Sequence, residues 1–161
     1  MLNVSEGINV GTEHDCRSVV DGNFAVIHAC KIPCHCAGVG YTGNLDKDHP
    51  EYLVSEKDNH LYLNIIDAAF PLSPKFGDPM FRAAFRFLEK SSKTKEVLIH
   101  CNQGHSRGPS IALAYMAKMD LIENQTYAAA TEDFKKIYPD YEPGKGVVHY
   151  LENNWNAVMQ L

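Results

Sequence analysis

The sequence predicts a single α/β domain in which a mostly parallel central sheet is flanked by helices on both sides. First, strand-like segments alternate with helical segments along the chain. Second, the strand-like runs 24–30, 61–66 and 96–100 are largely apolar on both faces, as strands buried between two layers are. Third, the 161 residues contain no internal repeat and no linker, so we expect one domain over residues 1–161.

The N-terminal elements begin with a short strand over Ile8–Gly11, which a glycine turn closes. A short helix is predicted over His14–Val20, and Gly22–Asn23 breaks it. Phe24–Cys30 follows as a compact strand rich in apolar residues. The polar, glycine-rich stretch Lys31–Asn59 has no clear periodicity and is too long for a plain connection. We therefore expect a functional or family-specific loop there.

The second half of the chain continues the alternation. A strand over Leu61–Ile66 places Asp67 at its C-terminal end. A proline-rich loop over 68–79 leads into a helix whose apolar stripe over 81–88 is typical of a core-facing surface, with a stop at Ser91. The remaining predicted elements are a strand at Glu96–His100 and helices at Ser110–Met119, Gln125–Tyr138 and Val147–Met159.

The composition is that of an ordinary globular protein and argues against several classes of function. There are 15 basic and 20 acidic residues, which give a net charge of -5. Because no cations cluster, we expect no nucleic-acid partner. No apolar stretch reaches the roughly 18 residues of a membrane span, and the first residues lack a secretory signal. Five cysteines, an odd number without framework spacing, indicate free thiols in a reducing cytoplasm.

The segment His100–Arg107, between a predicted strand and its helix, reads His-Cys-Asn-Gln-Gly-His-Ser-Arg. A loop that enters a helix N-terminus directs several backbone N–H groups at one point, where the helix dipole adds positive charge. Gly104 lets the backbone curl around phosphate oxygens, and the planar fork of Arg107 can bind two of them.

Cys101 lies within this predicted anion site. Helix N-termini and cationic neighbours favour the thiolate form of a cysteine, which is the nucleophilic form. A departing oxygen also needs a proton donor, and Asp67 is the leading candidate because ligand sites lie beyond the carboxyl ends of parallel strands. Asp58 and Asp78 are alternative acids but lie farther from a strand end, and a capping role is the alternative for Asp67.

The segment His100–Arg107 resembles the HCxxGxxR signature of the protein tyrosine phosphatase superfamily. The compact length and the upstream aspartate are similar to its dual-specificity branch. The resemblance is strongest to small bacterial or phage members, through this segment and through Lys47–Tyr52. It extends from the opening strand at Ile8–Gly11 to the closing turn and last helix over 138–152, and so covers most of the chain.

The resemblance implies a cysteine-phosphatase fold with Cys101 as nucleophile, Asp67 as general acid and Arg107 as phosphate clamp. It also implies that the substrate-binding residues are Asn102, Gln103, Gly104, His105, Ser106 and Arg107. The implied reaction is hydrolysis of phosphotyrosine, and also of phosphoserine or phosphothreonine, through a phosphocysteine. The partner is then a phosphorylated protein or a small phosphomonoester, and no cofactor is implied. Two alternatives stay open: a phosphate-binding module that turns over poorly, and a phosphatase of non-protein substrates such as a phosphoinositide or an RNA 5′ end. A rhodanese-like sulfur carrier fits the arginine spacing less well.

The residue after Arg107 departs from the family pattern. The family usually has serine or threonine there, and its hydroxyl bonds the cysteine sulfur and eases the release of that sulfur. Here the position is Gly108, followed by Pro109 and Ser110. We therefore expect slow breakdown of the phosphocysteine unless Ser110 supplies the missing bond.

A second concentration of possible metal ligands comprises His28, Cys30, Cys34, His35 and Cys36. These residues lack the paired C-x₂-C spacing of strong zinc sites, and Cys30 falls on a predicted buried strand. We therefore expect free thiols and no metal there. His100, next to the predicted nucleophile, is expected to orient the loop backbone through hydrogen bonds.

Overall fold

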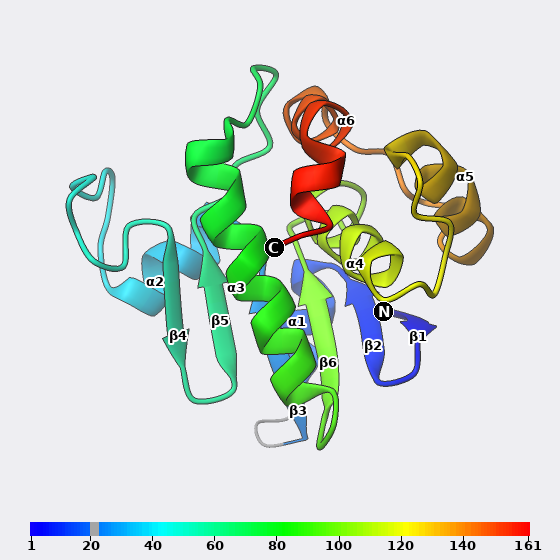
Figure 1. Cartoon of the computed structure of the whole chain (residues 1–161). Helices are drawn as coiled ribbons and strands as arrows, with labels where there is room; N and C mark the ends of the chain where they lie inside the picture. Colours follow the sequence, from blue (N-terminus) through cyan, green and yellow to red (C-terminus); the bar gives the residue numbers. More distant parts are fainter. Residues whose placement is uncertain (20–22) are drawn as a thin grey trace.

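Six strands form one mixed sheet within residues 1–19 and 23–161, the part of the chain that the computed structural model describes. The strands are β1 (Leu2–Ser5), β2 (Ile8–Gly11), β3 (Phe24–His28), β4 (Val54–Lys57), β5 (His60–Leu63) and β6 (Glu96–His100). Their order across the sheet is β1-β2-β6-β3-β5-β4 (Figure 1). The four central strands are parallel, and β1 and β4 pair antiparallel with β2 and β5 at the two edges. The predicted mostly parallel sheet is confirmed.

Helices cover both faces of this sheet. The front face in Figure 1 carries α3 (Pro74–Ser91), α4 (Arg107–Lys118), α5 (Tyr127–Ile137) and α6 (Lys145–Val158). The other face carries α1 (Glu13–Ser18), the π-helical turn η1 (Lys31–His35) and α2 (Cys36–Val39). The predicted single α/β domain with helices on both sides is therefore confirmed.

The register of the central strands brings their carboxyl ends to one level. His28 of β3 and Gly11 of β2 both pair with His100 of β6. The loop that follows β6 therefore emerges between two neighbouring strand ends, at the edge of a parallel sheet where ligand sites form.

The main core lies between the sheet and the front helices. Ala25, Ile27 and Ile99 point into it from the central strands and are completely buried. The predicted apolar stripe of α3 is confirmed as core, since Phe81 and Phe85 are at most 1% exposed. Burial of a large apolar side chain typically contributes about 1.5–3 kcal/mol, so this layer fixes α3 against the strands.

The shorter elements were not predicted from the sequence. The stretch Lys31–Asn59, predicted as a loop, contains η1, α2 and β4, and β1 was not predicted at all. Strands β1 and β4 lie at the edges of the sheet, where only one neighbour pairs with them. Two of the four residues of β4, Glu56 and Lys57, are exposed, so no apolar pattern marks it. Its formation depends on pairing with β5, which local sequence does not reveal.

Several predicted boundaries were also wrong. The strands predicted to end at Cys30 and Ile66 end at His28 and Leu63. Helix α3 begins at Pro74, seven residues before its apolar stripe. Proline is tolerated there because the first helical position needs no N–H donor. Helix α4 begins at Arg107, with a proline in its first turn, rather than at Ser110.

The other helices agree more closely with the predictions. Helices α5 and α6 start and end within two residues of the predicted limits. The helix predicted from His14 begins at Glu13 and ends at Ser18, with Val19 as its C-cap. Its predicted end at Val20, and the break at Gly22, lie outside the described residues.

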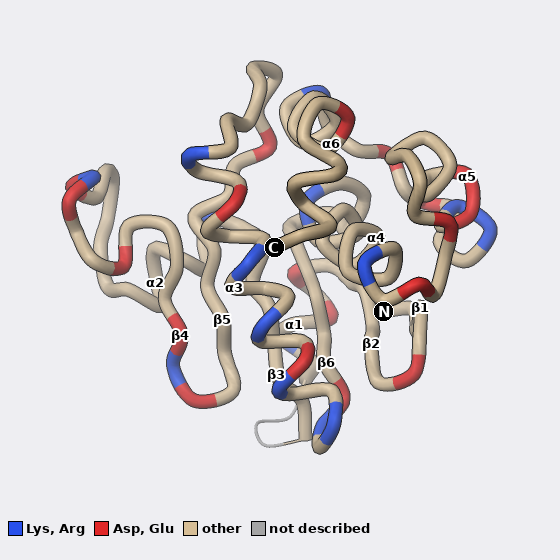
Figure 2. Tube along the Cα trace, in the orientation of Figure 1, with Lys and Arg blue, Asp and Glu red and all other residues tan. Residues whose placement is uncertain are grey.

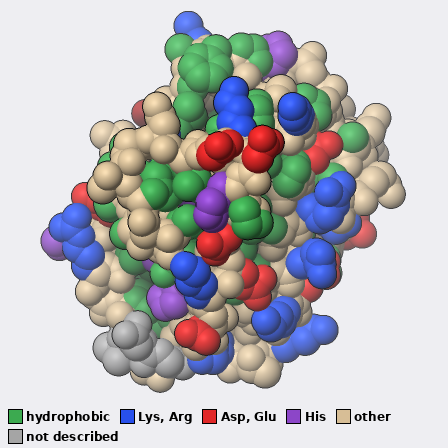
Figure 3. All heavy atoms as spheres, turned by 90° about the vertical axis from the view of Figure 1, so that its left-hand side faces the viewer, with side chains coloured by type: hydrophobic (Ala, Val, Ile, Leu, Met, Phe, Trp, Pro, Cys, Tyr) green, Lys and Arg blue, Asp and Glu red, His purple; other side chains and the backbone are tan. Residues whose placement is uncertain are grey.

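Charges of both signs are distributed over the surface. Lys and Arg alternate with Asp and Glu along the chain in Figure 2. The face in Figure 3 likewise mixes the two signs, with hydrophobic side chains gathered at its top. Among the helices in the described part of the chain, none is both long and apolar enough to span a bilayer.

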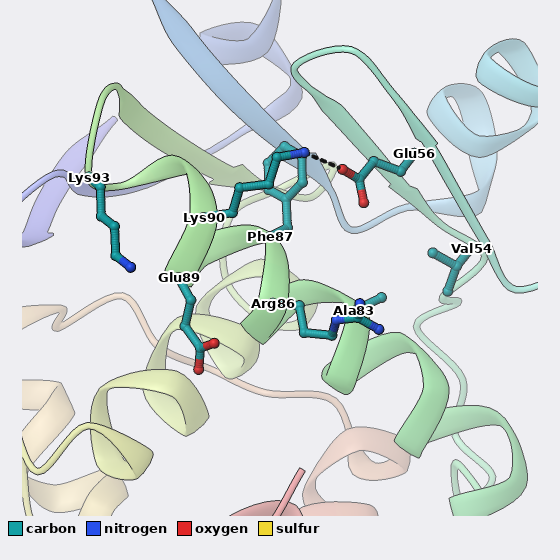
Figure 4. Close-up of a pocket in the computed structure, with 8 residues that line it drawn as sticks. All are labelled: Val54, Glu56, Ala83, Arg86, Phe87, Glu89, Lys90 and Lys93. Carbon is teal, nitrogen blue, oxygen red and sulfur yellow. Dashed lines mark hydrogen bonds and ion pairs between the residues drawn. The ribbon is translucent and has the colours of Figure 1, made fainter.

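A hollow of about 620 Å³ lies between α3 and β4 (Figure 4). The ion pair between Lys90 and Glu56, 3.0 Å long, bridges it. The residues that line it are Val54, Glu56, Ala83, Arg86, Phe87, Glu89, Lys90 and Lys93. None of these carries a thiol, hydroxyl or imidazole, and the hollow lies toward the end of α3 that precedes β6, whereas Cys101 follows β6. It is not the predicted site.

Candidate active site

The loop Cys101–Ser106 connects β6 to α4 directly, as the sequence predicts. Gly104 has a φ of +78°, a conformation that other residues rarely adopt, and this turn folds the loop back on itself. Tyr138, the residue that ends α5, supports the loop, because its hydroxyl donates to the Gly104 carbonyl at 2.9 Å. Burial raises the pKa of Tyr138 to about 12, so it remains a donor at neutral pH.

A cavity of about 160 Å³ opens above this loop. It is lined by Asp67, Cys101, Gln103, His105, Ser106, Arg107, Glu142 and Gly144. Cys101, which is only 1% exposed, is one of these lining residues. The cavity brings together the three residues predicted to carry the chemistry. Of the predicted loop residues, Asn102 and Gly104 do not line it.

One nitrogen of Arg107, Nε, makes no hydrogen bond and has only a long ion pair with Asp67. Its Nη2 donates to Asn102 Oδ1 at 2.8 Å and its Nη1 to the Ile65 carbonyl at 3.4 Å. Its Nε is buried without a hydrogen-bond partner, and Asp67 Oδ2, at 3.8 Å, is too far to accept one. A buried cationic donor without a partner is costly, and an anion bound in the cavity would satisfy it.

Asp67 reaches the cavity from a loop and not from a strand end. Strand β5 ends at Leu63, so the prediction that Asp67 directly follows a strand was wrong, although its carboxylate does line the cavity. Ser106 Oγ donates to Asp67 Oδ1 at 3.2 Å and accepts from the Gly144 N–H at 2.9 Å. The carboxylate is 41% exposed, so solvent can exchange protons with it.

The two alternative acids lie elsewhere. Asp78, within α3, accepts a hydrogen bond of 2.7 Å from the Tyr150 hydroxyl. Asp58 lies in the turn between β4 and β5, at the start of β5, whereas Asp67 follows the other end of that strand. Neither residue lines the cavity.

Asn102 has a side-chain role that the sequence analysis did not assign. Besides accepting from Arg107, its Nδ2 donates to Glu13 Oε2 at 3.1 Å and to the Ile32 carbonyl at 3.0 Å. The side chain therefore links the loop to α1 and η1 and orients the guanidinium. The sequence does not indicate this role, because Glu13 and Ile32 are distant from Asn102 in the chain.

Glu142 and Gly144 were also missed. The backbone N–H of Glu142 donates to the His105 carbonyl at 2.9 Å, which brings the Glu142 side chain to the cavity. A Cβ at position 144 would overlap Asp67 Oδ1, so this position requires glycine for Asp67 to sit where it does. Both residues lie between α5 and α6, where the sequence indicates only a turn.

The structure also bears on the departure at position 108. A Cβ on Gly108 would lie 3.1 Å from the His100 carbonyl carbon and 3.2 Å from the Cys101 nitrogen, tighter than ordinary contact. Ser110, the candidate substitute for the missing hydroxyl, places its Oγ 2.9 Å from the Tyr141 hydroxyl. That hydroxyl in turn lies 2.9 Å from the Tyr127 hydroxyl, so Ser110 belongs to a buried polar chain below the site.

His100 lies completely buried under the loop, as expected. Its Nε2 is 2.8 Å from Nδ1 of His28. Burial lowers the pKa of His100 to about 4, and burial together with the two neighbouring histidines lowers that of His28 to about 3. Both rings are therefore neutral at pH 7.

No family model matches this sequence, and no curated protein sequence matches it. Solved structures do. DUSP15 superposes with a TM-score of 0.67 at 19% identity, covering 99% of this chain and 90% of that chain. The human tyrosine phosphatase-like serine/threonine/tyrosine-interacting protein gives 0.64 at 17% identity, covering 100% and 98%. PTPMT1 in complex with PI(5)P gives 0.63 at 16%, covering 98% and 96%.

These structures superpose on nearly the whole chain, but few of the aligned residues are identical. The shared feature is therefore the arrangement of strands and helices, which places the loop after β6 at the carboxyl edge of the sheet. The chain has the fold of the compact, dual-specificity-like cysteine phosphatases of the protein tyrosine phosphatase superfamily.

Proposed function

We propose that residues 1–161 form the catalytic domain of a phosphatase that hydrolyses phosphate monoesters, phosphotyrosine foremost, through a phosphocysteine on Cys101. One observation carries the proposal. The Cys101 thiol, the unpartnered Nε of Arg107 and the Asp67 carboxylate belong to one small cavity above a helix N-terminus. A nucleophile, an anion donor and a proton donor are the three groups that phosphoryl transfer requires.

The reaction proceeds in two balanced steps. The thiolate sulfur of Cys101 attacks phosphorus, a P–S bond forms, and the P–O bond to the alcohol breaks as protonated Asp67 gives its proton to the departing oxygen. Water then attacks the phosphocysteine, Asp67 takes one of its protons, and inorganic phosphate leaves as the thiolate is restored. Arg107 and the loop N–H groups hold the equatorial oxygens in both steps.

The cavity favours a monoester on an extended, uncharged group. The buried sulfur of Cys101 requires the phosphate to enter the cavity, which an aryl ring allows more readily than a short serine side chain. Phosphoserine and phosphothreonine are then slower substrates. Two carboxylates, Asp67 and Glu142, line the cavity with a single permanent cation, Arg107. Like charges repel, so a substrate with several phosphates is disfavoured.

A second candidate is a module that binds phosphorylated ligands and turns over poorly. The observation in its favour is that Gly108 carries no hydroxyl and that Ser110 already bonds Tyr141. One structural relative, the serine/threonine/tyrosine-interacting protein, is described as tyrosine phosphatase-like. Pre-steady-state kinetics distinguishes the two, because a binding module gives at most one turnover per chain.

A phosphoinositide phosphatase is the third candidate. PTPMT1 was solved in complex with PI(5)P. In this chain, a mainly apolar groove of about 480 Å³ includes Ile66 and Phe70, on either side of Asp67, together with Lys31 and Lys47. A lipid monophosphate would match this groove better than a polyphosphorylated head group would.

The test compares wild type with Cys101→Ser on an aryl phosphate, phosphopeptides and PI(5)P. Wild type should release phosphate fastest from the aryl phosphate and phosphotyrosine peptides. Cys101→Ser should lose turnover but keep its affinity for phosphate, because a serine hydroxyl stays protonated while the loop donors remain. Activity above a tenth of wild type in this variant would refute the covalent mechanism.

A further inference from the structure

A mainly apolar groove of about 480 Å³ lies beside the cavity that contains Cys101. Ile66 and Phe70 line this groove, and between them in the chain lies Asp67, which lines the cavity. Ile66 is 50% exposed and Phe70 is 65% exposed. Large apolar side chains that are left in water next to a reaction site indicate a surface that a ligand covers. The position of the groove points to a second part of the same substrate.

Backbone hydrogen bonds hold the walls of the groove in place. The Lys31 N–H donates to the Ile65 carbonyl at 3.1 Å, and this bond joins η1 to the segment after β5. The Ile65 carbonyl also accepts from Arg107 Nη1 at 3.4 Å, so one carbonyl connects this wall to the guanidinium. The Leu72 N–H donates to the Gly146 carbonyl at 3.2 Å, which fixes the other wall on the first turn of α6. The shape of the groove is therefore set by the fold itself.

Both charged residues that line the groove are cationic. They are Lys31 and Lys47, and no Asp or Glu of the described part of the chain lines it. Asp46 and Asp48 flank Lys47 in the chain but do not line the groove, and the Asp48 N–H donates to the Asp46 carboxylate at 2.9 Å. The cavity differs, since two carboxylates line it. A carboxylate on the substrate is therefore repelled from the cavity and attracted to the groove.

We propose that the groove binds the peptide segment next to a phosphotyrosine and selects segments that carry an apolar side chain and a carboxylate. This inference rests on the proposed function, because the phosphotyrosine itself occupies the cavity. The apolar side chain packs against Phe70, and the carboxylate pairs with Lys31 or Lys47. Ile66 and Asp67 are consecutive, so residues close to the phosphotyrosine reach the groove while the phosphate stays in the cavity.

A peptide in solution fits the charge distribution of the chain better than a membrane lipid does. Attraction to an anionic bilayer requires a cluster of cations. The chain has a net charge of -5, and Lys and Arg alternate with Asp and Glu along it (Figure 2). The face in Figure 3 mixes both signs as well. Two lysines can pair with one carboxylate, but they are too few to hold the protein on a membrane surface.

The test compares three phosphotyrosine peptides of equal length. The first carries Leu and Glu beside the phosphotyrosine, the second has Lys in place of Glu, and the third has Ser in place of Leu. For wild type, kcat/KM should fall about tenfold from the first peptide to the third, because an apolar side chain is no longer buried. It should fall about three- to tenfold from the first to the second, and this difference should shrink as the salt concentration rises.

Variants of the groove should change these preferences. Phe70→Ser should remove the preference for Leu, and Lys31→Glu combined with Lys47→Glu should make the Lys peptide better than the Glu peptide. Leu121→Ser and Lys135→Glu are the matched controls, because neither residue lines the groove and Leu121 is 52% exposed. Both controls should keep the preferences of wild type. All variants should keep the wild-type kcat/KM on a small aryl phosphate, which does not extend beyond the cavity.

Three results would overturn the proposal. The first is equal kcat/KM for the three peptides. The second is a wild-type pattern of preferences in both Phe70→Ser and the double lysine variant, which would place the recognition elsewhere. The third is hydrolysis of PI(5)P in vesicles that exceeds that of every peptide and is lost in Phe70→Ser, which would assign the groove to a lipid.

A failure of the proposed function is distinguishable from a failure of this inference. If wild type hydrolyses none of the phosphomonoesters, the proposed function is wrong, and affinity then decides the role of the groove. Fluorescence anisotropy of the same three peptides should still show the tightest binding for the peptide with Leu and Glu. Equal affinities would refute the assignment of the groove.

Discussion

At the scale of single residues, the position of Asp67 depends on the absence of a side chain at residue 144. The carboxylate accepts from Ser106, which itself accepts from the Gly144 backbone, and a Cβ on Gly144 would occupy the space of Asp67 Oδ1. The carboxylate that we propose as the proton donor is thus held by contacts from two loops. A change at Gly144 should therefore alter acid catalysis without changing the loop that carries Cys101.

We therefore expect Asp67→Asn and Gly144→Ala to have related effects. Asp67→Asn should lower turnover by about 10²–10⁴-fold for alkyl phosphates, and much less for an activated aryl phosphate whose leaving group departs without a proton. Gly144→Ala should show a smaller loss with the same dependence on the leaving group. The measurement is the rate against the leaving-group pKa for a series of aryl and alkyl phosphates.

The double variant supplies the control. If Gly144→Ala acts by displacing Asp67, it should cost nothing further in the Asp67→Asn background, because coupled residues are not additive. A full additional loss there, or equal losses for all leaving groups, would show that another residue is the acid. Unchanged melting temperatures would exclude a general loss of folding.

At the scale of elements, sequence patterns gave the long and buried ones and missed those that depend on neighbours. Strand β6, apolar over most of its length, and the apolar stripe of α3 carry their own signal. Strand β4 and the turn η1 do not, since one is a short edge strand and the other lacks periodicity. The loop Cys101–Ser106 was predictable because its strand, glycine and helix start are consecutive. Asn102, Glu142 and Gly144 were not, because their functions come from contacts between distant segments.

The first turn of helix α4 lies against the end of the strand that precedes it, and this bears on the missing hydroxyl. Its second residue, Gly108, lies against the backbone of His100 and Cys101, so any side chain must displace the loop by a few tenths of an ångström. A serine there would restore a possible donor to sulfur but also strain the loop. The two effects have opposite signs.

We expect wild type to show a burst of product followed by slow turnover, because nothing at position 108 stabilises the departing thiolate. Gly108→Ser should raise the steady-state rate by about tenfold if a hydrogen bond to a charged group is gained, given about 1.5–3 kcal/mol for such a bond less the cost of strain. Gly108→Ala is the matched control, since it introduces the strain without the hydroxyl. Rapid-quench kinetics is the measurement. No burst in wild type, with equal rates in both variants, would refute slow breakdown.

At the scale of the whole molecule, the cavity is assembled from three separate parts of the chain. Asp67 comes from the loop after β5. The thiol comes from the loop after β6 and the guanidinium from the first residue of α4, and Glu142 with Gly144 comes from the connection before α6. An anion that bridges these parts binds only the folded state. Its binding free energy therefore adds to the free energy of unfolding.

We expect tungstate, a phosphate analogue, to raise the melting temperature of wild type. At 100 times its dissociation constant an anion adds about 2.7 kcal/mol. A domain of this size shifts by about 2–4 °C for each kcal/mol, so the expected rise is about 5–10 °C. Cys101→Ser should keep the shift, because the anion is held by the loop donors and not by a covalent bond. Arg107→Lys should lose most of it, since lysine keeps the charge but neither the planar fork nor the bond to Asn102. Calorimetry over a series of tungstate concentrations measures the melting-temperature shift of each variant. An undiminished shift in Arg107→Lys would mean that the guanidinium holds the loop rather than the phosphate.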